Sequence, residues 1–263
     1  NACIVLESGL LECWGAEGYY TFDNPECDSD CHFYPQPVLN EEGGEPVTDA
    51  SKVYMTEWRT CFIRTDGSVW CWGQYDFGFG VTGWELEEPQ SYPEPIEGLP
   101  AAAVDLSIGS QSMCALLEDT TVWCWGTGYH SPIGITGQCQ VEYIHYPEPV
   151  RYGPYGEIVT GVADVVHATS KFTTLRMENG DVLTWGDADW SNTSLYQPSP
   201  DWYPFEGLPI QDARAIEYNA SEGIRYILGE TGLVLSSKDK SGNVIDRSAG
   251  PIYDIACDQF SPE

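Results

Sequence analysis

Five segments of the chain share one pattern, in which two short apolar runs flank a polar tip. The first reads CIVLESGLLEC from Cys3 and turns at Glu7-Ser8-Gly9. A three-residue tip that ends in glycine suits a β-hairpin whose last turn residue has a positive φ. The pattern predicts five hairpins, which begin at residues 3, 61, 114, 174 and 226. In the third hairpin Thr120 replaces the glycine, which predicts a strained or longer turn.

Two further blocks recur ahead of the second to fifth hairpins. One contains prolines, as in YPEPI from Tyr92, and the other is a short apolar strand such as Val104-Asp105-Leu106. We interpret each repeat as a Pro-bounded edge strand, an inner strand and the hairpin that follows. Four short strands at a spacing of 52 to 60 residues are typical of a β-propeller blade. The sequence therefore predicts an all-β fold, a single propeller domain over residues 1–263 with five blades of four antiparallel strands.

The two ends of the chain complement each other in this pattern. The segment Ile252-Tyr-Asp-Ile-Ala256 matches an inner strand, yet no hairpin follows it. The hairpin at Cys3 conversely has no inner strand before it. We predict that the C-terminal strand pairs with the N-terminal hairpin and closes the ring. Exchange of this strand between neighbouring chains is the alternative.

Cysteines occupy opposite positions in three of the hairpins. Their register places the two cysteines of each hairpin face to face, which predicts disulfides within the hairpins. The predicted pairs are Cys3–Cys13, Cys61–Cys71 and Cys114–Cys124. In the fourth hairpin both are replaced together, by Thr174 and Thr184. The other four cysteines allow three connectivities, which the sequence leaves open: Cys27, Cys31, Cys139 and Cys257.

Ten cysteines without a C-x2-C pair favour disulfides over zinc ligation and an oxidising compartment. We therefore expect a secreted or cell-surface protein. The residue in first position, Asn1, fits a mature chain whose targeting peptide has been removed, and equally an engineered start. No apolar run is long enough for a membrane helix, so we expect no membrane insertion.

The charge of the chain is strongly acidic. It has 41 Asp and Glu against 11 Lys and Arg, a formal net charge of −30. Such a field repels phosphate backbones and anionic lipid headgroups, which argues against nucleic-acid binding. Solubility outside the cell, a basic partner or a bound cation are the roles that remain.

Three motifs resemble the repeats of the regulator of chromosome condensation (RCC1-like) family. They are CALLEDTTVWCWG from Cys114, WGQYDFGFG from Trp72 and YPEPIEGLP from Tyr92. The resemblance implies a propeller, typically of seven blades, that acts as an exchange factor, an inhibitor or a protein-binding surface. This chain departs from it by having five repeats. Its disulfide-bridged repeats resemble those of secreted bacterial members.

No pattern for a catalytic triad, a phosphate loop or a zinc protease is present, so we name no catalytic residue. Aromatic side chains after the Trp-Gly motifs are the candidates for binding a protein or glycan partner. They are Tyr75, Phe77, Tyr129 and Trp190. We predict a non-catalytic binding or structural module. The alternative is a glycan-active enzyme with channel carboxylates such as Asp105, Asp164 and Asp254.

Two weaker patterns complete the candidates. Four carboxylates lie in one loop and offer oxygen ligands for calcium, but their spacing fits no EF-hand, so we expect no cofactor: Asp23, Glu26, Asp28 and Asp30. Asn192 and Asn219 stand in N-x-S/T patterns and are predicted glycosylation sites in a host that performs that modification.

Overall fold

A computed structural model of the chain defines the fold over twelve segments. They are residues 2–15, 34–56, 59–73, 90–109, 112–127, 143–151, 157–168, 172–180, 182–186, 213–219, 224–229 and 234–236. Within these segments the secondary-structure elements are all β-strands. Across the same residues no helix has the length and apolarity to span a membrane.

The strands form five antiparallel sheets that follow one another in chain order. The first holds β1 (Ala2–Val5), β2 (Leu11–Trp14) and β3 (Gln36–Pro37). The second holds β4 (Ala50–Met55), β5 (Arg59–Arg64), β6 (Val69–Gly73) and β7 (Gln90–Pro95). The third holds β8 (Ala103–Ile108), β9 (Ser112–Leu117), β10 (Val122–Thr127) and β11 (Tyr143–Pro149). The fourth holds β12 (Val162–Ala168), β13 (Phe172–Met177) and β14 (Val182–Gly186), and the fifth β15 (Ala213–Asn219), β16 (Ile224–Gly229) and β17 (Val234–Ser236).

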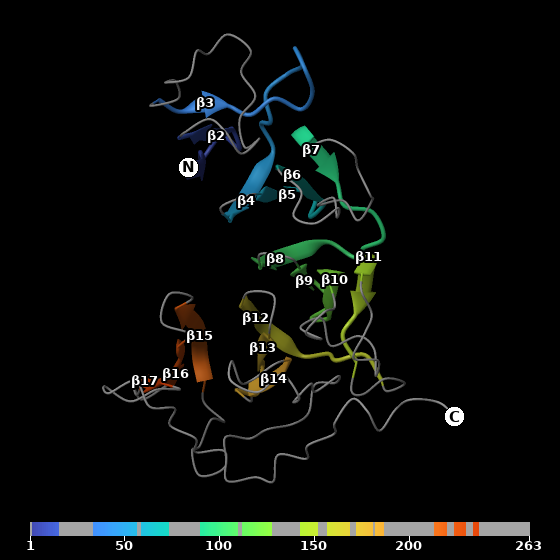
Figure 1. Cartoon of the computed structure of the whole chain (residues 1–263), viewed down its shortest axis with the longest axis vertical. Coiled ribbons are helices and arrows are strands. Elements are labelled where there is room, and N and C mark those ends of the chain that lie inside the picture. Colours follow the sequence, from blue (N-terminus) through green and yellow to red (C-terminus); the bar gives the residue numbers. More distant parts are fainter. Residues whose placement is uncertain are drawn as a thin grey trace.

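The sheets are arranged like propeller blades. Figure 1 shows them in succession along an arc, with the first sheet at one end and the fifth at the other. The first strands of successive sheets touch: β1 contacts β4, β4 contacts β8, β8 contacts β12 and β12 contacts β15. The predicted five-blade, all-β architecture is confirmed, with four strands in two blades and three described strands in the others.

All five predicted hairpins form in one register. Cys3 lies opposite Cys13, and the same pair position joins Cys61 to Cys71, Cys114 to Cys124, Thr174 to Thr184 and Tyr226 to Ser236. The three cysteine pairs are bonded as disulfides, with Cα atoms 4.0 or 4.1 Å apart. Such a short separation is that of the non-hydrogen-bonded pair of an antiparallel ladder.

The proline-containing strands belong to a different blade than the sequence suggested. We grouped each with the hairpin that follows it, and this grouping is wrong. Strand β7 pairs with β6 of the preceding hairpin, with Pro95 opposite Trp70, and β11 pairs likewise with β10, with Pro149 opposite Trp123. Each is the outermost strand of its sheet. Proline is tolerated there because no further strand needs its missing N–H.

The core lies between adjacent blades. One cluster packs the first blade on the second and includes Leu11, Val47, Phe62 and Trp72. Phe62 and Trp72 meet edge to face, with ring centroids 6.0 Å apart. A larger cluster continues through the second, third and fourth blades and includes Trp125, Met113 and Leu175. The recurring Trp of the Trp-Gly motif is therefore a packing residue where the structure describes it, since Trp72 and Trp125 are at most 2% exposed.

Backbone hydrogen bonds at the hairpin tips tie the first four blades to one another. The Gly9 carbonyl accepts from Ala50 N–H (3.0 Å), and the Gly67 carbonyl accepts from Ala103 N–H (2.9 Å). The entry segments of β4, β8 and β12 also bond to their own hairpins, as when Thr65 N–H donates to the Asp49 carbonyl at 2.8 Å. Each of these three entry segments is thus held between two tips.

Thr120 shows how the third hairpin tolerates the loss of its glycine. The turn keeps its length, and Thr120 has φ 65°, the one positive φ outside glycine among the described residues. Its carbonyl still accepts from Val162 N–H at 3.1 Å, and its hydroxyl accepts from Gly161 N–H at 2.9 Å. The predicted strain is present, and a new hydrogen bond to the next blade offsets part of it.

The first sheet has no inner strand among the residues that the structure describes. In the second to fifth sheets β4, β8, β12 and β15 occupy that place. Residues 252–256, which we predict to close the ring, lie outside the described segments.

Candidate functional site

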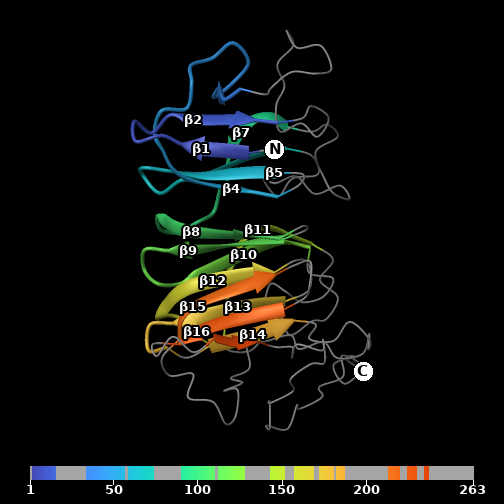
Figure 2. The same ribbon diagram turned by 90° about the vertical axis from the view of Figure 1, so that its left-hand side faces the viewer.

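The blades present two different faces. Figure 2 shows the hairpin turns projecting on one side, which we call the tip face. The ends of β6 and β7 at Gly73 and Gln90, and of β10 and β11 at Thr127 and Tyr143, lie at the opposite ends of the ladders. We call that side the loop face. The candidate binding residues follow these strands in sequence and lie outside the described segments: Tyr75, Phe77, Tyr129 and Trp190.

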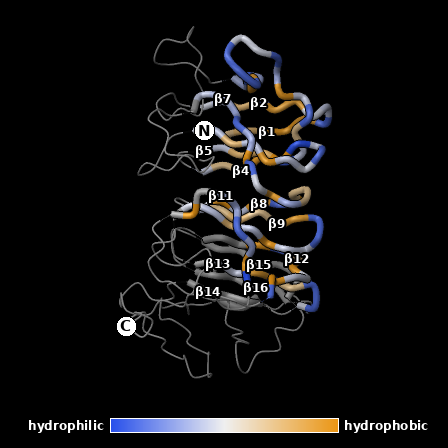
Figure 3. Tube along the Cα trace, turned by 90° about the vertical axis from the view of Figure 1, so that its right-hand side faces the viewer, coloured by the Kyte–Doolittle hydropathy of each residue, from blue (hydrophilic) through white to orange (hydrophobic). Residues whose placement is uncertain are grey.

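The tip face is hydrophilic and acidic. Figure 3 shows polar turns beyond strands that are largely apolar. The exposed tip residues include Glu7, Asp66, Glu118, Asp119 and Glu178. The described turns are short and internally hydrogen-bonded, as when Gly67 N–H donates to the Arg64 carbonyl at 2.9 Å. This face therefore presents negative charges on short turns that hydrogen bonds hold in place.

Two tips contain the same side-chain relay, which the sequence analysis missed. Asp66 Oδ1 accepts from both the N–H and the hydroxyl of Ser68, and the Ser68 Oγ accepts from Trp70 Nε1–H at 3.1 Å. The third blade repeats this with Asp119, Thr121 and Trp123. The shared signal is D-x-[S/T]-V-W, visible in DGSVW and DTTVW. The relay fixes the turn and orients the outward Trp.

Asp66 provides a pH-dependent test of this relay. The Ser68 hydroxyl and N–H hold the pKa of the Asp66 carboxyl below its ordinary value of 3.8. Because the folded pKa is lowered, the stability it contributes is present above that value and is lost as the pH falls through the folded pKa. The effect is small because the carboxyl is exposed. Ser68→Ala raises the Asp66 pKa toward 3.8 in an NMR titration, whereas the control Ser51→Ala leaves it unchanged; a Ser68→Ala titration equal to that of the parent contradicts the relay.

Arg64 links the second tip to the segment before β4. Its Nη1 lies 2.7 Å from Asp49 Oδ1, and its Nη2 donates to Asn40 Oδ1 at 2.6 Å. The guanidinium carbon sits 4.2 Å from the Trp70 ring centroid. The cation is therefore neutralised and stacked, and it does not offset the acidity of this face.

A polar cluster joins the inner strands of the second and third blades. Tyr54 of β4 donates its hydroxyl to Asp105 of β8, and Lys52 Nζ lies 3.6 Å from the same carboxylate. Burial raises the pKa of the Tyr54 phenol, and the neighbouring Asp105 carboxylate raises it further. The phenol therefore stays a neutral donor, and its stabilising effect is lost only as the pH rises beyond its ordinary value of 10.0.

The inner-strand carboxylates thus serve the contacts between strands. Asp105 bridges two blades, and Asp164 of β12 lies 3.8 Å from Arg176 Nε on the adjacent β13. The third, Asp254, lies outside the described segments. Asp105 and Asp164 each face a cation of this chain, so both carboxylates take part in contacts between neighbouring strands.

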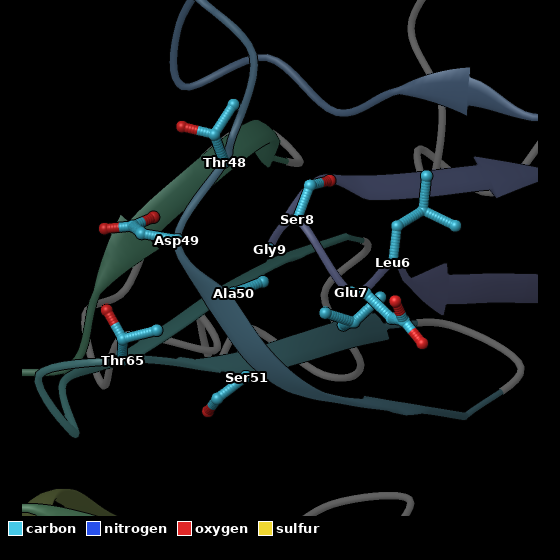
Figure 4. Close-up of a pocket in the computed structure, with 10 residues that line it drawn as sticks. Leu6, Glu7, Ser8, Gly9, Thr48, Asp49, Ala50, Ser51 and Thr65 are labelled. Carbon is cyan, nitrogen blue, oxygen red and sulfur yellow. The ribbon is translucent and has the colours of Figure 1, made fainter.

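A pocket of about 490 Å³ lies on the tip face, among the residues that the structure describes. Figure 4 shows it between the first hairpin tip, with Leu6, Glu7 and Ser8, and the entry segment of β4, with Thr48 and Asp49. Residues of β1 and its turn are part of its lining, and it is an open groove rather than an enclosed cavity.

Several predicted sites fall outside the described segments. These are the calcium candidates Asp23, Glu26, Asp28 and Asp30, the cysteines Cys27, Cys31, Cys139 and Cys257, and the sequon residue Asn192. Asn219 is the last residue of β15. Among the residues that are described, no group of three or more His, Cys, Asp or Glu side chains is placed to hold a metal ion.

Comparison with known proteins shows similarity in sequence and in fold. No family model matches the sequence. Human E3 ubiquitin-protein ligase HERC2 is 31% identical over 135 residues, which are 49% of this chain and 2% of that protein. Prp20p from Saccharomyces cerevisiae matches 89% of this chain and 55% of its own with a TM-score of 0.64 at 15% identity. Human WBSCR16 matches 76% of this chain and 51% of its own with a TM-score of 0.56 at 16% identity.

The chain therefore spans a small part of the curated relatives that it matches and about half of the solved structures. The blades and these folds define a β-propeller. Its repeats resemble RCC1-like repeats, in sequence through the similarity to HERC2 and in fold through the similarity to yeast RCC1 (Prp20).

Proposed function

We propose that this chain is a non-catalytic, secreted or cell-surface propeller that binds a protein partner through its loop face. The observation that carries the proposal is the contrast between the faces. The described hairpin turns on the tip face are short and fixed by hydrogen bonds. The connections after β6 and β10, residues 74–89 and 128–142, are long and carry Tyr75, Phe77 and Tyr129. Binding residues concentrate in long loops held by a rigid scaffold.

The similar structures and the charge of this chain support a protein partner, and its disulfides support a location outside the cell. The structures of the similar Prp20p concern its binding to Gsp1p, histones and Kap60, which are proteins. Three cations each pair with a carboxylate of this chain: Lys52, Arg64 and Arg176. The net charge of −30 is left for an outside partner to balance. We propose a partner with a basic contact surface. The three disulfides favour an oxidising compartment.

The test compares two variants that differ in the face they alter. The loop variant changes Tyr75, Phe77, Tyr129 and Trp190 to Ser, and the tip variant changes Glu7, Glu118 and Glu178 to Gln. Proteins captured from the extracellular fraction of the source are identified, and their Kd is measured by calorimetry at two salt concentrations. We expect the loop variant to bind about tenfold or more weakly and the tip variant to stay close to the parent. Binding that is lost only in the tip variant contradicts the proposal.

A glycan panel tests the non-catalytic part of the proposal. We expect no product to be released from any glycan. Asp105→Asn is the informative variant, because the structure gives Asp105 a bridging role to Tyr54 and Lys52. It is expected to lower stability without affecting any glycan binding. Product release that Asp105→Asn abolishes overturns the proposal in favour of an enzyme.

A further inference from the structure

The first blade has a free strand edge with a defined set of hydrogen-bonding groups. Leu6 N–H donates to the Leu10 carbonyl at 2.9 Å, so the backbone of Leu6 points toward β2. Because backbone groups alternate along a strand, those of Cys3, Val5 and Glu7 point away from β2. In the other four sheets an inner strand covers this edge, and in the described part of the first sheet nothing does. An uncovered edge is a template for another strand.

The tip hydrogen bonds show which contact the first blade lacks. Thr65 N–H donates to the Asp49 carbonyl (2.8 Å), Glu118 N–H to the Ala102 carbonyl (2.9 Å) and Glu178 N–H to the Gly161 carbonyl (2.7 Å). Each acceptor is in the entry segment of that blade's own inner strand. Glu7 holds the equivalent position in the first blade, and no described residue supplies a carbonyl to its N–H.

The tip-face pocket lies along this same edge. Its lining runs over Val5, Leu6 and Glu7 on one side and over residues 48–51, which lead into and begin β4, on the other. Figure 4 shows the two segments flanking the opening. In the second blade the equivalent stretch of β5 is covered by the start of β4, where Ala50 pairs with Arg64 and Lys52 with Ile63. The pocket is thus the place that an inner strand would enter. Ile4 and Leu6 on β1 are 43% and 36% exposed.

We infer that residues 251–256 of the same chain occupy this edge as the inner strand of the first blade, in one specific register. Asp254-Ile255 repeats Asp105-Leu106 of β8 and Asp164-Val165 of β12. Leu106 lies opposite Ala115, and Val165 opposite Leu175. By the same register Ile255 lies opposite Ile4 and Asp254 opposite Val5. The Pro251 carbonyl then accepts from Glu7 N–H.

The chain has enough length to reach the edge. Fourteen residues separate Ser236, the end of β17, from Pro251. Extended chain of this length spans about 50 Å. A compact domain of this size has a radius of gyration of about 18 Å and so is about as wide as that span. Pro251 has no N–H, and its place requires only a carbonyl acceptor, as at Ala102.

Hydrogen exchange of the β1 amides tests the inference because its pattern alternates. The full chain is compared with Asp254→Pro, which removes the N–H that faces the Val5 carbonyl in the proposed register, and with the control Gln259→Pro outside the strand. We expect the Val5 and Glu7 amides to exchange about tenfold or more faster in Asp254→Pro, while the Ile4 and Leu6 amides, bonded to β2, change little. Equal exchange of Val5 and Glu7 in all three proteins overturns the inference.

A second measurement needs no variant and separates the two sources of the strand. In the proposed register Ile4 and Ile255 form a non-hydrogen-bonded pair, which gives an Hα–Hα nuclear Overhauser effect in the full chain. We expect this effect in a sample that light scattering shows to be monomeric. Its absence overturns the inference. So does its appearance only in a dimer or larger assembly, because the strand then comes from a second copy.

Discussion

Replacing Gly67 by alanine is expected to destabilise the protein by about 3 kcal/mol, measured as the free energy of unfolding in urea. Gly67 has φ +81°, and a Cβ built there lies 2.3 Å from the Ala102 Cβ and 2.8 Å from its Cα. Neither of these atoms belongs to a flexible side-chain end, so the tip and the next blade must move apart. That movement also stretches the hydrogen bond from Ala103 N–H to the Gly67 carbonyl, 2.9 Å long in the parent.

Gly43 supplies the matched control. It also has a positive φ, +65°, but a Cβ there meets nothing within 4 Å. Gly43→Ala is therefore expected to lower the free energy of unfolding by about 1 kcal/mol, the cost of placing a residue with a Cβ in the left-handed conformation. The difference between the two variants measures the close approach between blades. Equal losses at Gly43 and Gly67 would show that the tip contact contributes nothing.

The third hairpin suggests a rescue of the same site. There Thr120 and Gly161 stand where the second tip has Gly67 and Ala102, and the Thr120 hydroxyl accepts from Gly161 N–H. Gly67→Thr alone is expected to destabilise strongly. Adding Ala102→Gly transplants the natural pair and recovers part of the lost stability. A double variant no more stable than the single one contradicts this account of Thr120.

Replacing Cys61 and Cys71 together by threonine is expected to lower the free energy of unfolding by about 3 kcal/mol. The two residues are ten apart in sequence and fully buried, and their bond restricts the unfolded chain. Threonine is the conservative replacement, because Thr174 and Thr184 hold the same pair position in the fourth blade. Urea unfolding of the oxidised proteins measures the change.

The fourth blade provides the reverse experiment. Thr174→Cys with Thr184→Cys places two cysteines in the register that the other hairpins use, and we expect a fourth hairpin disulfide with a gain of about 2 kcal/mol. Thiol titration before and after unfolding reports whether the bond forms. Two new free thiols would show that the fourth hairpin does not share the geometry of the first three.

The hairpins could be predicted because their determinants are local. Apolar alternation, the glycine tips and the facing cysteines lie within a few residues of one another, so Cys3 and Cys13 specify their own register. The strained turn at Thr120 followed in the same way from a single missing glycine. The relay of Asp66, Ser68 and Trp70 is equally local, and the repeated D-x-[S/T]-V-W signal would have revealed it.

The sequence by itself determined the five repeats, their hairpins and their spacing, because these depend on neighbours along the chain. Only the tertiary structure decided which hairpin each proline strand joins. In a continuous series of repeats the sequence does not mark where one blade ends and the next begins. It also decided that Tyr54 donates a hydrogen bond to Asp105 and that Gly161 N–H donates to the Thr120 hydroxyl. Within the described residues, it left one edge of β1 without a partner strand. These features join residues about 40 or more positions apart, and they exist only once successive blades pack together.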